Sequence, residues 1–180
     1  MSRSGGLPGA LVISLDFELR WGVRDRCAPG DPYEKNLLGA REVIPAMLDI
    51  FASYGIAATW ATVGLLFACS RSEANSFAPR DRPEYVDRSL SPFEDTTGEN
   101  ESDDPLHYAP SLIRRIAATP GQEIGTHTFS HYYCLAPGQT ARSFRADLES
   151  ALAIARQFGI RPRSIVFPRN QHNPAYDEIL

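Results

Sequence analysis

Cysteine is scarce in this chain of 180 residues, which contains only Cys27, Cys69 and Cys134. An odd number at irregular spacing excludes a disulfide framework and a paired-cysteine zinc finger, so we expect reduced thiols. Long apolar runs are missing too, since the run that begins at Leu11 ends before Asp16. That is too short for a signal sequence or a membrane span. The sequence therefore predicts a cytoplasmic protein, unless a longer natural N-terminus has been removed.

Positive charge is not in excess either. The formal net charge is −4 at pH 7, and acidic and basic residues are interspersed. No basic surface is expected that could bind a phosphate backbone, so the sequence predicts no nucleic-acid partner. Hydrophobic residues make up 43% of the chain and charged residues 22%, as in an ordinary globular domain with a core. A small or carbohydrate-like ligand remains open.

Hydrophobic periodicity predicts that strands and helices alternate along the chain. The expected strands are 11–15, 56–62, 123–126 and 164–167, and the expected helices are 42–54, 110–119 and 140–158. This order predicts an α/β fold of parallel strands joined by right-handed crossovers. Four strands are too few to close a barrel, so we expect an incomplete or distorted (β/α) barrel, truncated at its C-terminus. Either the natural protein continues, or an oligomer covers the open edge.

The stretch at about 70–108 differs in composition from the rest of the single domain, 1–180. It is rich in proline, acidic and small polar residues, and it has almost no apolar periodicity. These features predict a long loop insertion or lid on the surface, which is functional or mobile.

Polar side chains follow the predicted strands at the ends where α/β folds gather their chemistry. Asp16 and Glu18 follow the first strand, His127 and His131 the third, and Arg169 the fourth. Asp16 and Glu18 are two residues apart on an extended chain, so both side chains point to one side. Two such carboxylates favour a bound cation. Alternatively, they are solvated or paired with nearby arginines.

His127 and His131 lie in the segment HTFSH at spacing i, i+4. On a helical turn this spacing places both imidazoles on one face, close enough to share a metal ion. An ordinary polar loop explains the same spacing, because short motifs also match by chance.

Other polar and aromatic residues are candidates for substrate contact. Arg169 begins a polar run that includes Asn170 and Gln171, although a solvent loop is the simpler explanation for the latter two taken singly. Trp21 and Trp60 could wall a pocket for the face of a sugar, with core packing as the alternative.

Taken together, these segments resemble the polysaccharide deacetylase family over nearly the whole chain. SLDFE at 14–18 stands where the family has TFDDG, and ATWATVG at 58–64 is similar to ATFFVVG. EIGTHTFSH at 123–131 contains the family's H(S/T)xxH and is the most specific match. FPRNQ at 167–171 is a loose counterpart of FRPPYG, and one residue separates the two acids that are adjacent in the family's first motif.

The resemblance implies a hydrolase that removes the N-acetyl group from an N-acetylated carbohydrate by metal-activated water. It assigns Asp16 as the catalytic base and Glu18, His127 and His131 as ligands of a divalent metal ion, zinc first. Arg169 would orient Asp16 and keep it ionised. Two imidazoles and one carboxylate leave coordination positions open, as in catalytic zinc sites.

The sequence departs from the family's motifs in two places, and each departure leaves another function open. Some relatives with altered first motifs, such as metal-independent allantoinases, work without a metal, so the chain could be a metal-independent amidohydrolase acting on a non-sugar amide or ureide. The family's general acid is a His in a later LxxH motif, and this sequence contains no such motif. A non-catalytic glycan-binding homologue is therefore the third hypothesis.

Overall fold

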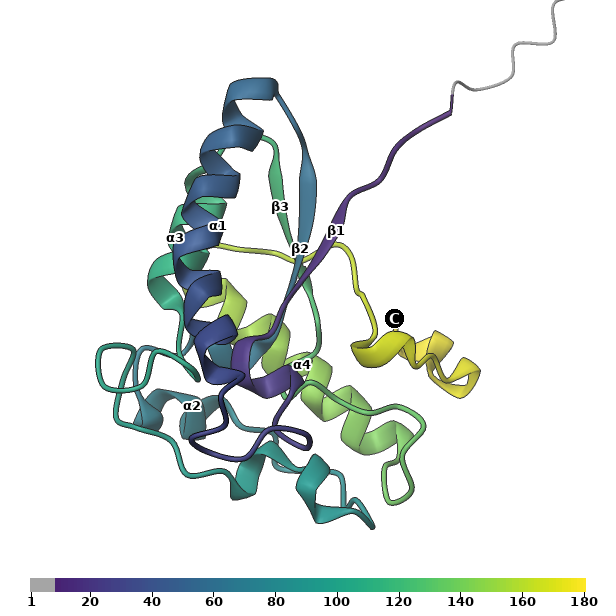
Figure 1. Cartoon of the computed structure of the whole chain (residues 1–180). Helices are drawn as coiled ribbons and strands as arrows, with labels where there is room; N and C mark the ends of the chain where they lie inside the picture. Colours follow the sequence, from purple (N-terminus) through teal and green to yellow (C-terminus); the bar gives the residue numbers. More distant parts are fainter. Residues whose placement is uncertain (1–8) are drawn as a thin grey trace, which may run out of the picture.

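The protein is described by a computed structural model over residues 9–180, and its centre is a parallel three-stranded sheet in the order β1-β2-β3 (Figure 1). The strands are β1 (Ser14–Phe17), β2 (Ala58–Thr62) and β3 (Gln122–Thr126). The α-helices are α1 (Glu34–Tyr54), α2 (Arg71–Phe77), α3 (Pro110–Ala118) and α4 (Ala141–Gln157). The expected α/β class with parallel strands is confirmed, and the sheet does not close into a barrel.

Short 3-10 helices follow several of these elements. They are η1 (Leu19–Gly22), η2 (Gly64–Phe67), η3 (Arg88–Leu90), η4 (Pro92–Glu94), η5 (Pro168–Asn170) and η6 (Pro174–Ile179). The turns η1 and η2 begin directly beyond the carboxyl ends of β1 and β2, so the chain changes direction at the edge of the sheet where polar residues gather.

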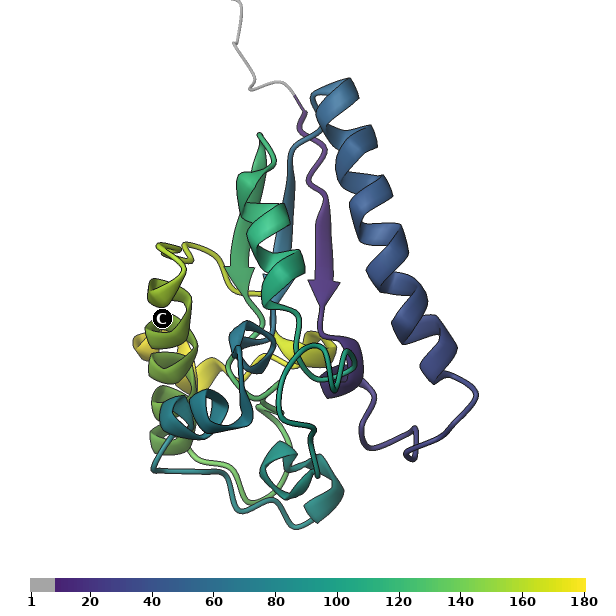
Figure 2. The same ribbon diagram turned by 90° about the vertical axis from the view of Figure 1, so that its left-hand side faces the viewer.

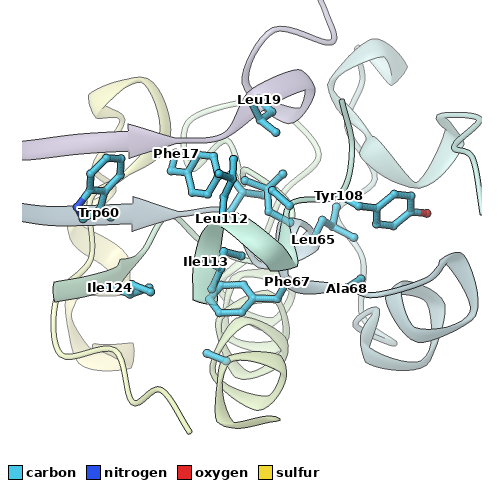
Figure 3. Packing of buried hydrophobic residues seen from close by; sticks show 14 of the residues in the cluster. Phe17, Leu19, Trp60, Leu65, Phe67, Ala68, Tyr108, Leu112, Ile113 and Ile124 are labelled. Atoms are coloured by element: carbon cyan, nitrogen blue, oxygen red, sulfur yellow. The ribbon is translucent and has the colours of Figure 1, made fainter. Parts of the chain in front are cut away.

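The core lies between the sheet and the helices α1 and α3, which lie side by side on one face of it (Figure 2). Figure 3 shows Phe17, Trp60 and Ile124 from the three strands in this apolar cluster. Trp60 is 2% exposed, its ring packs against Phe17 and Phe51, and its Nε1 donates to Gln122 Oε1 at 3.0 Å. Trp60 is therefore a core residue rather than the wall of a sugar pocket.

The expected helices are confirmed, but the expected strand at 164–167 is wrong. Within residues 9–180 this segment contributes only one isolated bridge, Thr126 to Ile165. Pro162 and Pro168 flank it. Because proline has no N–H to donate to a neighbouring strand, the ladder stays short.

The segment 70–108 is more ordered than its composition predicts. It contains α2, whose N-cap Ser70 accepts a hydrogen bond from the Glu73 N–H at 3.1 Å. It also buries Tyr85 and Tyr108, which are 6% and 1% exposed. The segment lies at the carboxyl ends of the strands (Figure 2). No helix within 9–180 combines the length and the apolar character needed to cross a membrane.

Candidate metal centre

Three potential metal ligands converge at the carboxyl ends of β1 and β3. Glu18 Oε2 lies 2.9 Å from His131 Nε2 and 3.3 Å from His127 Nε2. One ligand atom from each residue lies within 4.8 Å of the other two. The histidine side chains are 0% and 1% exposed, whereas that of Glu18 is 28% exposed. The cluster is therefore buried on its histidine side and accessible on its carboxylate side.

The loop after β3, rather than a helical turn, brings the two histidines together. Thr128 and His131 have φ values of 64° and 53°. Both lie in the left-handed region, which is uncommon for residues other than glycine. The expectation that HTFSH forms a helical turn is therefore wrong, although the two imidazoles do lie close, with ring centroids 5.1 Å apart.

Asp147 on α4 anchors this loop by accepting hydrogen bonds from it. Its Oδ1 accepts hydrogen bonds from the N–H of Phe129 at 2.7 Å and of Ser130 at 3.3 Å, and its Oδ2 accepts one from the Ser130 hydroxyl. Burial raises the pKa of Asp147 to about 6, although these hydrogen bonds act in the opposite direction. Sequence analysis missed Asp147. The available signal was a single acid on the apolar face of a helix, three residues after Phe144 and four before Ala151.

His127 is fixed in the tautomer that a metal requires. Its Nδ1 lies 2.8 Å from the carbonyl oxygen of Val166. Because a carbonyl can only accept, Nδ1 carries the proton and Nε2 presents a lone pair toward Glu18. Nε2 of His127 and Nδ1 of His131 are buried without hydrogen-bond partners in the described part of the chain. An orphaned imidazole nitrogen facing a carboxylate fits a divalent metal ion such as zinc.

Electrostatics favour the ligating protonation states. Burial alone would raise the pKa of Glu18, but its interactions with the His127 and His131 imidazoles outweigh burial and lower the pKa to about 2. Burial is the largest cause that lowers the pKa of His131, and the net shift is downward although Glu18 acts in the opposite direction. The carboxylate is therefore ionised and the imidazole neutral at pH 7, as metal ligation demands.

Gly22 gives the Glu18 side chain its space. A Cβ placed on Gly22 would lie 2.0 Å from Glu18 Cδ and Oε1. We expect Gly22→Ala to push the carboxylate away from the histidines and weaken zinc binding by about 10- to 100-fold, as changes beside metal ligands do. Zinc titration by calorimetry measures this, with Gly39→Ala as the control, because nothing lies within 4 Å of a Cβ on Gly39. Equal zinc affinity in the two variants would contradict this role for Gly22.

Asp16 and Arg169 do not meet. Asp16 is exposed on β1, beside Ala61 of β2, and makes no hydrogen bond or ion pair within residues 9–180. Arg169 instead donates from Nη2 to Asp25 Oδ1 at 2.5 Å. Within residues 9–180 the Arg169 guanidinium is thus paired with a different carboxylate, and the expected role of Arg169 toward Asp16 stays a prediction. Sequence analysis did not single out Asp25.

The remaining predicted contact residues lie in varied surroundings. Trp21 is 2% exposed and its Nε1 donates to the His107 carbonyl at 2.9 Å. Gln171 Oε1 accepts from the Leu135 N–H at 3.3 Å, so it ties two loops together. Asn170 is exposed, directly after Arg169. Their contacts with a substrate stay a prediction.

Several solved structures are similar to this chain. They are a family 4 carbohydrate esterase from Streptomyces lividans in complex with acetate (14% identity, TM-score 0.49), the peptidoglycan deacetylase PdaC from Bacillus subtilis (15%, 0.48) and the BpsB deacetylase domain from Bordetella bronchiseptica (18%, 0.46). The similarity covers 95%, 93% and 93% of this chain, which spans 57%, 54% and 58% of theirs.

No curated protein matches the sequence. The polysaccharide deacetylase family, in contrast, matches residues 33–180, a range that includes both histidines and Arg169 and begins after Glu18. This match confirms the resemblance carried by EIGTHTFSH. The chain belongs to the polysaccharide deacetylase family.

Proposed function

We propose that this chain carries the metal site of an N-deacetylase that hydrolyses the acetamide of an N-acetylated sugar or glycan precursor. The observation that carries the proposal is the convergence of Glu18, His127 and His131 on one point in a member of this family. The donor set of two imidazoles and one carboxylate is that of a catalytic zinc site, with positions left for water and substrate.

The residues of the chain would have separate roles in this hydrolysis. Glu18, His127 and His131 would hold the divalent ion, which when bound supplies Lewis acidity and lowers the pKa of a water. The Val166 carbonyl keeps His127 Nε2 deprotonated and aimed at the site. A carboxylate base, Asp16 in the family's pattern, would take a proton from the attacking water. The C–N bond then breaks, and acetate and a free amine leave.

Elemental analysis of the purified chain tests the metal site. We expect about one zinc per chain in the wild type and none in the His127→Ala, His131→Ala double variant, because three donors are needed to hold the ion. His172→Ala is the matched control, since His172 is exposed and pairs with Asp177 at 2.6 Å. It should keep the full zinc content.

Acetate release from tri-N-acetylchitotriose by the zinc-loaded wild type then tests the reaction. The absence of metal in the wild type, even after zinc or cobalt is added, would contradict the proposal and favour a metal-independent amidohydrolase, which an allantoin assay would detect. Bound zinc and bound glycan without acetate release would favour the non-catalytic homologue.

A further inference from the structure

The segment 70–108 is hydrogen-bonded to the loop after β3, which carries both histidines. The Tyr133 N–H donates to the Tyr85 hydroxyl oxygen at 2.9 Å, and both tyrosines are buried. Backbone hydrogen bonds flank this contact on both sides, from Glu84 N–H to the Gly138 carbonyl at 2.9 Å and from Val86 N–H to the Pro137 carbonyl at 3.0 Å. Residues 84–86 are therefore fixed along the loop that supplies His131.

The same segment is also bonded to the chain that follows Glu18. Carbonyl groups of the segment accept hydrogen bonds from this part of the chain: Leu106 from Arg20 N–H at 3.2 Å, His107 from Trp21 Nε1 at 2.9 Å, and Leu90 from Arg24 Nη2. The Trp21 N–H in turn donates to the Glu18 carbonyl at 3.1 Å. The segment 70–108 therefore connects the two loops that supply the candidate metal ligands.

The backbone at His131 needs such contacts. Its φ of 53° is left-handed, and this conformation persists in residues other than glycine only where the surrounding structure holds it. Asp147 accepts the N–H of Ser130, the residue before His131. Tyr85 accepts the N–H of Tyr133, the second residue after it. His131 is therefore held from both sides, by α4 and by the segment 70–108.

The Tyr133 ring connects this hydrogen bond to the imidazole. It lies edge-on against the His131 ring, with centroids 5.1 Å apart, and His131 Nε2 lies 2.9 Å from Glu18 Oε2. Burial raises the pKa of Tyr85, so its hydroxyl is neutral at pH 7. Without this acceptor the Tyr133 N–H would be buried and unpaired, which is costly, so we expect Tyr133 to shift against the imidazole.

We propose that Tyr85 positions the metal ligand His131, so that the segment 70–108 is a fixed part of the metal centre rather than a lid. The inference rests on the proposed function, because it concerns the same metal site. Tyr85 acts through Tyr133 and is a positioning residue, not a ligand. Groups that orient a ligand from outside the coordination sphere set the affinity for the metal ion.

Tyr85→Phe and Tyr108→Phe, compared in the full chain, test this role. Both remove one buried hydroxyl from the segment 70–108, but that of Tyr108 bonds to Thr97 and to the Gly98 carbonyl, within the segment itself. We expect Tyr85→Phe to weaken zinc binding by about 10-fold, as the loss of a supporting contact does. Tyr108→Phe should keep the wild-type affinity. Zinc titration by calorimetry measures both.

Cobalt absorption separates positioning from a general loss of stability. The visible bands of bound Co²⁺ depend on the geometry of its ligands, so Tyr85→Phe should shift them and Tyr108→Phe should not. Urea denaturation of the metal-free variants should show a loss of stability in both, because each loses buried hydrogen bonds. Wild-type zinc affinity and cobalt bands in Tyr85→Phe, or the same changes in Tyr108→Phe, would overturn the assignment while leaving the metal site intact.

Gly138→Ala tests the contact from the other side. Gly138 has a φ of 96°, and a Cβ on it would collide with the Glu84 carbonyl oxygen, so alanine should push residues 84–86 away and weaken zinc binding. Gly159→Ala is the control, because Gly159 is also left-handed, with a φ of 70°, but nothing lies within 4 Å of its Cβ. Equal zinc affinity in the two variants would contradict the role of the segment. A wild type that binds no zinc would instead overturn the proposed function, and this inference with it.

Discussion

Asp147→Ala is expected to lower the free energy of unfolding by about 3–5 kcal/mol, because it strands several buried donors at once. The N–H groups of Phe129 and Ser130 and the Ser130 hydroxyl all donate to Asp147, which is 0% exposed. Each donor left without an acceptor costs about 1–3 kcal/mol. The loop that carries His131 would lose its anchor, so zinc binding should weaken as well. Urea denaturation of the metal-free protein and zinc titration measure the two effects.

Two further variants sharpen this test. Asp147→Asn keeps one acceptor oxygen and should fall between alanine and the wild type. Glu149→Ala lies on the same helix but is exposed, so its effect should stay within about 0.5 kcal/mol. Similar destabilisation by Glu149→Ala and Asp147→Ala, or wild-type zinc affinity in Asp147→Ala, would show that Asp147 does not support the histidine loop.

The three candidate metal ligands were predictable from the sequence, whereas the geometry of their loop was not. Glu18 and His127 directly follow β1 and β3, and the carboxyl ends of parallel strands meet at one edge of the sheet. The spacing of His127 and His131 pointed to the right pair through a helical turn that does not form. Asp147 on α4 binds the backbone of Phe129 and Ser130, which lie between the left-handed Thr128 and His131. Such tertiary contacts leave no trace in local periodicity.

Asp147 and Asp25 were missed for the same reason, because their contacts are tertiary and leave no local sequence pattern. Asp25 and Arg169 are 144 residues apart, so no local pattern connects them. The family motif predicted that Arg169 pairs with Asp16, but in this chain the Arg169 side chain pairs with Asp25. Long-range ion pairs depend on how the loops pack, which the alternation of strands and helices does not determine.

Elements with regular apolar spacing were predicted well. The helix expected at 140–158 is α4 (Ala141–Gln157), and its capping Thr140 accepts from the Ser143 N–H. The segment 70–108 was predicted as a long loop because its buried residues, Tyr85 and Tyr108 among them, are spaced irregularly. Such side chains are buried by the shape of the surrounding surface rather than by one face of a helix or strand.

Zinc is expected to stabilise the wild type strongly at pH 7 and to have little effect on Glu18→Gln. A ligand that binds only the folded state at about 1,000 times its dissociation constant adds about 4 kcal/mol to the free energy of unfolding. Glutamine removes the carboxylate that completes the donor set with His127 and His131. Thermal or urea denaturation with and without zinc measures the difference. Asp16→Asn serves as a control that should keep the gain.

The metal-free proteins should also differ in how their stability depends on pH. Glu18 has a pKa lowered to about 2, so its contribution is present above its unfolded pKa of 4.5 and is lost as the pH falls toward 2. The contribution of Asp147 to stability depends on pH in the opposite direction. Its pKa is raised from 3.8 to about 6, so its contribution is present below pH 3.8 and is lost as the pH rises through 6.

Together these two acids should give the metal-free wild type a stability component that rises from about pH 2, peaks near pH 4 and declines toward pH 6. Urea denaturation at half-unit pH steps would show it. Glu18→Gln should remove the rising limb and keep the decline, whereas Asp147→Asn should keep the rise and flatten the decline. If Glu18→Gln leaves the acid limb unchanged, Glu18 does not interact with the two histidines in solution, and the geometry on which the metal site rests is wrong.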